Sequence, residues 1–440
     1  MENYHLIGIK GAGMSALAQV LHDMGHRVQG SDVQTELFTQ KPLEQRRIPL
    51  LPFDAGNIRG DLKVIASNAF PDDHPEISAC REKQIPMFRY HHFLGEWIRR
   101  FTSIAVTGTH GKTTTTGMLA HLFGATRPTS YLIGDGTGLG MPDSRYFVFE
   151  SCEYRRHFLA YSPDYAIITN IDFDHPDYFS DIDDVTDAFR EMAKRVKKHI
   201  VACGDDANVQ RLAVDKPVLH YGFGERNELR AYGVATGKEG TSFAVDWRGH
   251  PLGIFFIPQF GRHNVLNALA VIGVALLEDL NVEQVKACMA TFRGVKRRFT
   301  EKIVNGNILI DDYAHHPAEI RATLDAVRAK YPDKKVISVF QPHTYSRLEK
   351  FMDEFAESLS GSDEVYLCNI FGSARESTGN VSIQQLIDRI PSSSLISEQN
   401  IGMLQRYKDC VLLFMGAGDI QKYEESYELH FRTLNMSEKP

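Results

Sequence analysis

Short apolar runs typical of β-strands alternate with helical patterns along the whole chain, and this alternation constrains the fold more than any other feature. Examples are the runs at residues 4–9, 103–107, 308–313 and 336–340. Alternating strands and helices favour α/β domains with largely parallel sheets.

The length of the chain points to several domains. At 440 residues it exceeds one ordinary domain, and length alone suggests about three. The pattern of apolar runs places a first unit at residues 1–98, a second at 99–296 and a third at 297–440. A helical segment at residues 89–100 leads out of the first unit.

Charge, cysteine spacing and hydropathy argue against several classes of protein. A net charge of −7 disfavours a general nucleic-acid-binding protein, which needs a basic surface. The six cysteines are scattered singly and form no CxxC pair, as in a reduced protein without a local cysteine zinc site. The longest apolar stretch, residues 265–277, is too short to span a membrane, and we expect no signal peptide. We therefore expect a cytoplasmic protein that binds neither nucleic acid nor membrane.

Residues 106–116 read VTGTHGKTTTT and place a glycine-lysine-threonine step between a strand and a helix. Glycines let backbone amides face phosphate oxygens, and the N-terminus of the following helix adds the positive end of a dipole. Lys112 would then reach the terminal phosphates, and the Thr113 hydroxyl would meet Mg²⁺. The spacing departs from GxxxxGK[ST], because Val106 stands where the first glycine is usual and the earlier glycine is Gly108. The alternative is a strand–turn–helix corner with an incidental lysine.

A phosphate loop needs a carboxylate to hold the metal ion. Glu150 ends the apolar run YFVFE, which places it at the carboxyl end of a strand, where ligands bind in open α/β folds. A polar cluster, TNIDFDHPDYF, follows the next strand and contains His175. His175 is a metal ligand, a hydrogen-bond partner or ordinary polar surface.

A glycine-rich turn, GIKGAGM, follows the first strand and matches part of a dinucleotide-binding fingerprint, with Asp32 near the end of the second strand. The full GxGxxG pattern is not met, because Gly11 and Gly13 are followed by Ala16. The turn is therefore either a nucleotide diphosphate site or only a tight turn.

Several motifs occur in one order along the chain: TGTHGKTTTT, a glutamate at a strand end, TNIDFDH, FGRHNVLNALA, GVKRRF and DDYAHHP. Together they resemble the Mur ligases of peptidoglycan synthesis, whose phosphate loop has this altered glycine spacing. GIKGAGMSALA at the start, with QPHTYSR and MGAGDI later, is similar to the branch of that family that joins L-alanine to UDP-N-acetylmuramate. The motifs run from Gly8 to Ile420 and so cover nearly the whole chain.

The resemblance implies an enzyme of three α/β domains. The N-terminal domain would be Rossmann-like and bind the UDP-sugar. The central domain would resemble a phosphate-loop ATPase with a mostly parallel sheet, and bind ATP and Mg²⁺. The C-terminal domain, also Rossmann-like, would close over both and bring the amino acid. An acyl phosphate of the sugar's carboxylate would be the intermediate.

The resemblance also assigns site residues by matching position. For ATP they are Gly108, Thr109, His110, Gly111, Lys112, Thr113, Thr114, His263, Asn264, Asn267, Arg298 and Asp312. For the UDP-sugar they are Gly11, Ala12, Gly13, Met14, Ser15, Ser31, Asp32, Ser67 and Asn68. For Mg²⁺ they are Thr113, Glu150 and His175, and for the acyl group and amino acid they are Tyr313, His315, His343 and Arg347. Catalytic roles fall to Lys112, Glu150, His175, Arg298, His343 and Arg347.

Two positions depart from the family's pattern. Many members of the L-alanine branch have arginine where this chain has Thr344, so Arg347 or another group must supply the missing cation. Many also have Asp-Glu where this chain has Cys152 and Glu153, which leaves the role of Glu153 less secure than that of Glu150.

Other interpretations stay open. A ligase that returns a tripeptide to the same sugar nucleotide would share the fold and most ATP residues, although QPHTYSR favours L-alanine. A folylpolyglutamate synthase would lack the GIKGAGM unit, an NAD oxidoreductase would leave the phosphate loop unexplained, and a nucleotide-binding switch would not consume the sugar. Locally, Arg297 and Arg298 can be a solvated surface step, and residues 315–317 can cap a helix beginning at Ala318. The oligomeric state does not follow from the sequence.

Overall fold

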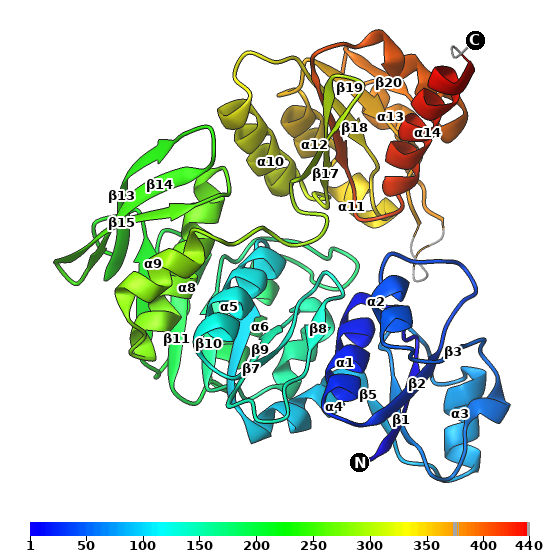
Figure 1. Ribbon diagram of the computed structural model, residues 1–440, viewed down its shortest axis with the longest axis vertical. Helices are drawn as coiled ribbons and strands as arrows, with labels where there is room; N and C mark the ends of the chain where they lie inside the picture. Colours follow the sequence, from blue (N-terminus) through cyan, green and yellow to red (C-terminus); the bar gives the residue numbers. More distant parts are fainter. Residues whose placement is uncertain (373–375, 377, 438–440) are drawn as a thin grey trace.

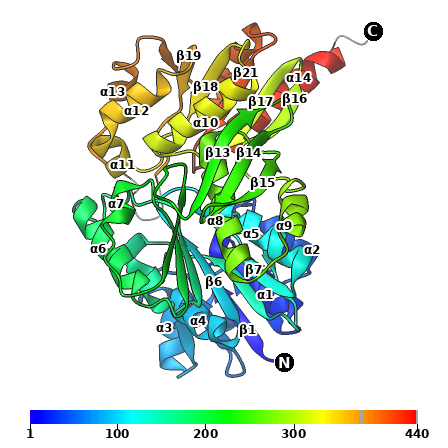
Figure 2. The same cartoon turned by 90° about the vertical axis from the view of Figure 1, so that its left-hand side faces the viewer.

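The computed structural model describes residues 1–372, 376 and 378–437 and contains three α/β units, each built around its own sheet (Figure 1). The C-terminal unit lies at the top of the molecule and the N-terminal unit toward the bottom in both views (Figure 2). The expected fold class of three α/β domains is therefore confirmed. The strands of each sheet fall inside the three expected segments, and the boundaries after residues 98 and 296 stay predictions.

The first unit is a five-stranded parallel sheet in the order β3-β2-β1-β4-β5, which is the order of a Rossmann half-sheet and its extension. Side chains alternate across each strand, so Leu6 packs in the core that contains α1 and Ile7 in the core that contains α3. The strands are β1 (Asn3–Ile7), β2 (Arg27–Ser31), β3 (Leu50–Leu51), β4 (Lys63–Ala66) and β5 (Met87–Arg89). The helices are α1 (Ala12–Asp23), α2 (Gln40–Gln45), α3 (Pro75–Glu82) and α4 (Tyr90–Trp97).

The second unit has a ten-stranded sheet in the order β15-β14-β13-β12-β11-β10-β6-β9-β7-β8. From β7 to β13 neighbouring strands pair in parallel, as expected, whereas β14, β15 and β8 are antiparallel additions at the two edges that the sequence did not predict. The strands are β6 (Thr102–Thr107), β7 (Thr129–Leu132), β8 (Gly138–Leu139), β9 (Tyr146–Glu150), β10 (Tyr165–Ile168), β11 (His199–Cys203), β12 (Val218–Gly222), β13 (Leu229–Thr236), β14 (Thr241–Trp247) and β15 (His250–Ile257). The helices are α5 (Lys112–Thr126), α6 (Ile182–Ala193), α7 (Ala207–Gln210), α8 (Arg262–Leu277) and α9 (Val282–Met289).

The third unit has a six-stranded sheet in the order β16-β17-β21-β18-β19-β20, parallel except for the edge strand β16. The strands are β16 (Thr300–Val304), β17 (Asn307–Asp312), β18 (Val336–Phe340), β19 (Glu364–Leu367), β20 (Ser393–Leu395) and β21 (Val411–Met415). The helices are α10 (Pro317–Lys330), α11 (Tyr345–Lys350), α12 (Met352–Leu359), α13 (Ile383–Ile387) and α14 (Gln421–Ser437).

The first and second units are joined by direct packing of α1 on the hairpin that contains β8. Gln19 Nε2 donates a hydrogen bond to the carbonyl oxygen of Gly136 at 2.7 Å, and Gly138 N donates to Gln19 Oε1 at 3.3 Å. A Cβ atom on Gly138 would lie 2.0 Å from the carbonyl oxygen of Ala16, so glycine is needed for this close approach. The contact fixes the middle of α1 against the edge of the central sheet.

The long apolar helix α8 lies in the core of the second unit. Helix α8, the longest apolar stretch of the sequence, is buried along most of its length against the central sheet. Among the helices of the described residues, none is both long and apolar enough to cross a membrane.

Candidate active site

The phosphate loop joins strand β6 to helix α5 at the carboxyl edge of the central sheet. Gly108 and Gly111 have φ angles of 133° and 81°, in the region that glycine adopts without strain. A Cβ atom on Gly108 would lie 1.9 Å from Thr169 Oγ1, and one on Gly111 would lie 2.7 Å from Asn267 Oδ1. The loop therefore needs both glycines, because of its backbone angles and because other residues approach it closely.

Helix α5 begins at Lys112, whose ammonium group contacts the backbone of its own loop and Glu153. Nζ donates to the carbonyl oxygens of Gly108 and Thr109 at 2.5 and 2.9 Å, and lies 3.0 Å from Glu153 Oε2. Burial alone would raise the pKa of the Glu153 carboxyl, but Lys112 and His175 lower it below its ordinary value. Glu153, whose role the sequence left insecure, is thus the counter-ion of the phosphate-loop lysine.

Glu150 ends strand β9 beside the first turn of helix α5. Its Oε2 accepts a hydrogen bond from Thr113 Oγ1 at 2.8 Å, and burial raises the pKa of its carboxyl group. A Cβ atom on Gly134 would lie 2.1 Å from the same Oε2, so the loop after β7 closes over the carboxylate. A half-buried carboxylate next to a hydroxyl offers the hard oxygen ligands that Mg²⁺ prefers. These two residues therefore fit the expected metal ion.

His175 faces Glu153. Its Nε2 lies 3.5 Å from Glu153 Oε1, and its ring centroid lies 4.6 Å from that of Tyr154. Together with Cys152 and Glu153 it forms a group whose potential ligand atoms lie within 4.8 Å of one another. The metal-binding role of His175 stays a prediction.

A cavity of about 610 Å³ lies between the central and C-terminal units. Two-thirds of the residues expected to bind ATP line it, namely His110, Gly111, Thr114, His263, Asn264, Asn267, Arg298 and Asp312. The cavity is not lined by Gly108, Thr109, Lys112 or Thr113. Lys112 turns toward Glu153 and Thr113 toward Glu150. The cavity also has an aromatic part, where the rings of Phe260 and Phe299 stack 6.2 Å apart with Lys330 above them.

The connection between these two units runs along the cavity wall. Arg297 and Phe299 have φ angles of 57° and 52°, and Asp312 accepts hydrogen bonds from Phe299 N at 2.8 Å and Ala314 N at 2.9 Å. Burial raises the pKa of Asp312 to about 6, although Arg298 opposes the rise. In this structure Asp312, which is expected to bind ATP, therefore also holds the connection in place.

The interpretation of Arg297 and Arg298 as a solvated step is wrong for Arg297. Its side chain is 5% exposed and donates to the carbonyl oxygen of Gly416 at 2.7 Å, so it is buried against the C-terminal sheet. Arg298 instead lines the cavity, with Nη1 3.7 Å from Glu319 Oε1 and its guanidinium 5.0 Å from the ring centroid of Tyr313.

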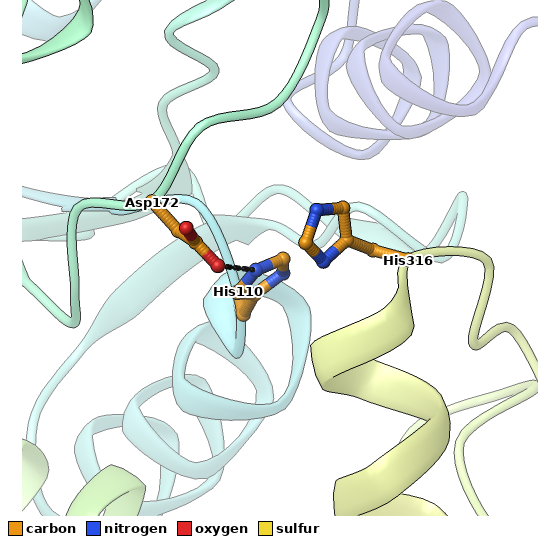
Figure 3. A group of neighbouring side chains, drawn as sticks. All are labelled: His110, Asp172 and His316. Carbon is orange, nitrogen blue, oxygen red and sulfur yellow. Dashed lines mark hydrogen bonds and ion pairs between the residues drawn. The ribbon is translucent and has the colours of Figure 1, made fainter. Parts of the chain in front are cut away.

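His110, in the phosphate loop, contacts the C-terminal unit. Figure 3 shows its ring between Asp172, from the loop after β10, and His316, at the start of α10. Its Nε2 lies 3.2 Å from Asp172 Oδ2 and its Nδ1 lies 3.5 Å from Glu319 Oε1. Burial lowers the pKa of His110, but the two carboxylates outweigh burial and raise it to about 9. The protonated ring of His110 thus connects the phosphate loop to Glu319 of helix α10.

His316 caps helix α10, as one of the sequence interpretations held. Its Nδ1 accepts a hydrogen bond from Ala318 N at 3.3 Å, and burial lowers its pKa to about 4. The helix itself begins at Pro317, one residue earlier than expected.

Three of the four residues expected at the acyl and amino-acid site lie side by side. The ring of His315 is 5.3 Å from that of Tyr313 and 6.0 Å from that of His343. Burial lowers the pKa of His343 to about 3, and the ring stacks on Phe371 at 5.8 Å. The fourth residue, Arg347, contacts His343: its Nη1 donates a hydrogen bond to the carbonyl oxygen of His343 at 3.1 Å.

Arg347 is occupied by an acidic residue of the central unit. Its Nε lies 2.9 Å from Asp174 Oδ1, and the two side chains are 5% and 8% exposed. The structure thus does not leave this guanidinium free for an amino-acid carboxylate, and its assigned role there stays a prediction.

The residues expected to bind the UDP-sugar divide into two groups. Met14, Ser15 and Ser31 are buried, and both Asp32 oxygens are occupied by the backbone amides of Lys10 at 2.6 Å and Val33 at 2.7 Å. These four residues therefore stabilise the glycine-rich turn after β1 from within the protein. The other five, Gly11, Ala12, Gly13, Ser67 and Asn68, are at least partly accessible at the N-terminus of α1 and in the loop after β4.

Sequence reasoning did not single out four charged residues of this region. Glu319 and Lys330 line the cavity, whereas Asp172 pairs with His110 and Asp174 with Arg347. Two signals were present. The aspartates stand in the polar cluster TNIDFDH, and Glu319 stands in the first turn of the helix that follows His315 and His316.

Family models match almost the whole chain. Residues 3–102 match the model described as the Mur ligase family catalytic domain, and residues 106–275 match the Mur ligase middle domain. Residues 297–418 match the Mur ligase glutamate ligase domain.

Solved structures of similar architecture agree with these matches. The UDP-N-acetylmuramate-alanine ligase of Thermotoga maritima is 27% identical, with a TM-score of 0.84 over 98% of this chain and 100% of that one. A murein peptide ligase of Psychrobacter arcticus is 23% identical, with a TM-score of 0.73 over 97% and 98% of the two chains. The UDP-N-acetylmuramate:L-alanyl-γ-D-glutamyl-meso-diaminopimelate ligase of Neisseria meningitides is 27% identical, with a TM-score of 0.60 over 68% and 100%.

Proposed function

The chain belongs to the Mur ligase family, and from this premise we propose that it joins L-alanine to the lactyl carboxylate of UDP-N-acetylmuramate. As a family member it is an ATP-dependent acid–amino acid ligase of peptidoglycan precursor synthesis. The choice of L-alanine is supported by the QPHTYSR and MGAGDI motifs and by the full-length likeness to the Thermotoga ligase.

One observation carries the proposal. The cavity between the central and C-terminal units is lined both by the phosphate loop and by Arg298, which borders the group of Tyr313, His315 and His343. A nucleotide in this cavity would present its terminal phosphate to residues of both units. Such an arrangement suits transfer of a phosphoryl group to an acid held between domains.

In the first step an oxygen of the sugar's carboxylate attacks the γ-phosphorus of ATP. The bond from this phosphorus to the β–γ bridging oxygen breaks, ADP leaves, and an acyl phosphate forms. Carboxylate and triphosphate repel each other, so cations must lie nearby. Lys112 and Arg298 supply two positive charges. To reach the phosphates, the Lys112 ammonium group must break its ion pair with Glu153.

Thr113 and Glu150 would hold Mg²⁺, because they join a hydroxyl and a carboxylate within 2.8 Å. When bound, the ion neutralises phosphate charge and fixes its orientation.

In the second step the amine nitrogen of alanine attacks the acyl carbon. The carbon–oxygen bond to phosphate breaks, phosphate leaves, and the nitrogen gives up a proton to the departing phosphate, which leaves the amide. His343 is neutral at ordinary pH because burial lowers its pKa to about 3. A histidine with so low a pKa is a poor general base for the amine proton. Its role would instead be to position the amine by a hydrogen bond.

The second candidate is the tripeptide ligase, which is supported by the likeness to the Psychrobacter and Neisseria proteins. A phosphate-release assay with ATP, Mg²⁺ and UDP-N-acetylmuramate separates the two. We expect release with L-alanine and background release with L-alanyl-γ-D-glutamyl-diaminopimelate. The opposite preference would contradict the choice of L-alanine.

A further inference from the structure

Tyr90 opens helix α4 at the point where the chain passes from the first unit to the second. Its two neighbours are held by the loop after β4. Arg89 Nη1 donates to the carbonyl oxygens of Ser67 and Phe70 at 3.1 and 2.8 Å, and His91 Nδ1 lies 2.9 Å from Asn68 Oδ1. The backbone of Tyr90 is therefore fixed on both sides beside residues expected to bind the UDP-sugar.

The phenol end of Tyr90 lies against the glycine-rich turn. A Cβ atom on Gly13 would lie 2.9 Å from the Tyr90 hydroxyl oxygen and 3.0 Å from Cζ. Gly13 stands in the first turn of helix α1. The approach of Tyr90 gives a physical reason for this glycine, since its φ angle does not require it.

The hydroxyl of Tyr90 lies near enough to Glu150 and Cys152 of the central unit to be influenced by their charges. Burial raises its pKa, and the nearby Glu150 and Cys152 raise it further, so the hydroxyl keeps its proton at any physiological pH. Tyr90 is half-buried, and among the described residues its hydroxyl makes no hydrogen bond within the protein. A neutral O–H donor is thus available between the two units.

The two expected sites lie very near each other at this place. A Cβ atom on Gly134 would touch the Glu150 carboxylate, and one on Gly136 would lie 4.0 Å from Ala12 Cα. A segment of three residues therefore spans from the carboxylate beside the phosphate loop to the N-terminus of helix α1. A diphosphate at that N-terminus, where backbone amides and the helix dipole favour an anion, would lie beside the Tyr90 hydroxyl.

We propose that Tyr90 is a substrate-contacting residue whose hydroxyl donates a hydrogen bond to the diphosphate of the UDP-sugar. The inference rests on the proposed function, because it takes the UDP-sugar as the ligand of the first unit. It explains an unpartnered donor, a glycine inside a helix and the fixed neighbours of Tyr90 together.

The test is Tyr90→Phe in the full chain, which keeps the ring and removes only the hydroxyl. Binding of UDP, of UDP-N-acetylmuramate and of ATP is measured by titration calorimetry. Loss of a hydrogen bond to a charged acceptor should weaken binding of both uridine nucleotides about tenfold or more, with ATP binding changed less than about twofold. The control is Tyr161→Phe, whose ring packs on Phe149 at 5.2 Å, and which should bind all three as the wild type does.

Equal binding of UDP by wild type and Tyr90→Phe, at an unchanged unfolding temperature, would overturn the proposal. Weakened UDP-N-acetylmuramate binding with unchanged UDP binding would also overturn it, because the contact would then be to the sugar. If the wild type itself binds neither uridine nucleotide, the proposed function fails first and this inference fails with it.

Discussion

Arg347 Nε lies 2.9 Å from Asp174 Oδ1, and this buried ion pair joins the C-terminal unit to the central one. Burial raises the pKa of the Asp174 carboxyl, but Arg347 and the neighbouring histidines hold it well below its usual range. The pair is therefore charged at neutral pH and serves as a direct link between the domains that form the cavity.

Asp174→Asn should weaken this link, because it leaves the buried guanidinium of Arg347 without its counter-charge. Breaking a buried pair costs about 3–5 kcal/mol, so the chain should open or unfold at a lower urea concentration. Urea unfolding and small-angle scattering measure the two effects. The control is Asp353→Asn, which breaks the exposed pair with Arg389 and should cost less than about 1 kcal/mol. Equal effects of both variants would contradict the role given to Asp174.

His110 should make the free energy of unfolding depend on pH. Its pKa is raised to about 9 by Asp172 and Glu319 against the effect of burial, so its stabilising contribution is complete below its ordinary pKa of 6.5. The contribution is lost as pH rises through about 9, and it amounts to ~3 kcal/mol at most. The free energy of unfolding of His110→Gln should therefore change less between pH 6.5 and 9.5 than that of the wild type. Parallel curves for the two proteins would refute this.

Lys112→Ala should abolish ADP formation while leaving UDP-sugar binding largely intact, because Lys112 belongs to the phosphate loop of the central unit. Phosphate release and calorimetry with UDP-N-acetylmuramate test the two halves of this statement. Lys197→Ala, at an exposed position, should behave as the wild type. Near-native turnover of Lys112→Ala would show that the lysine has another role.

Gly134→Ala should lower kcat by about tenfold or more, because the added Cβ would lie 2.1 Å from Glu150 Oε2 and displace the carboxylate. Gly124→Ala is the matched control, since a Cβ there meets no atom within 4 Å in helix α5. The control should keep its activity and gain up to about 1 kcal/mol of stability. Steady-state kinetics and thermal unfolding separate the outcomes, and a fully active Gly134→Ala would remove Glu150 from the site.

The sequence predicted those features that depend on local pattern. The phosphate loop, the position of Glu150 at the end of a strand and the cap at residues 315–317 each follow from spacing and from adjacent elements. The antiparallel strands β14 and β15 were not expected, because they extend an edge of the sheet without any motif that marks them.

The direction in which a side chain points could not be predicted where the backbone is irregular. Glu153 lies at the start of a short turn after strand β9, and only the folded chain shows that it binds Lys112. Arg297 and Arg298 are adjacent and alike, yet a left-handed φ angle at Arg297 sends one side chain into the C-terminal unit and the other to the cavity. Contacts between units that are far apart in sequence, such as that of Arg347 with Asp174, leave no local pattern at all.

The most direct test of the central claim is one assay on purified protein with ATP, Mg²⁺ and UDP-N-acetylmuramate, to which amino acids are added singly. ADP, phosphate and the new amide are measured together. The account predicts equal amounts of all three with L-alanine, and none of the amide when either nucleotide is left out. Absence of ADP and amide with every amino acid, from a folded protein, would contradict it.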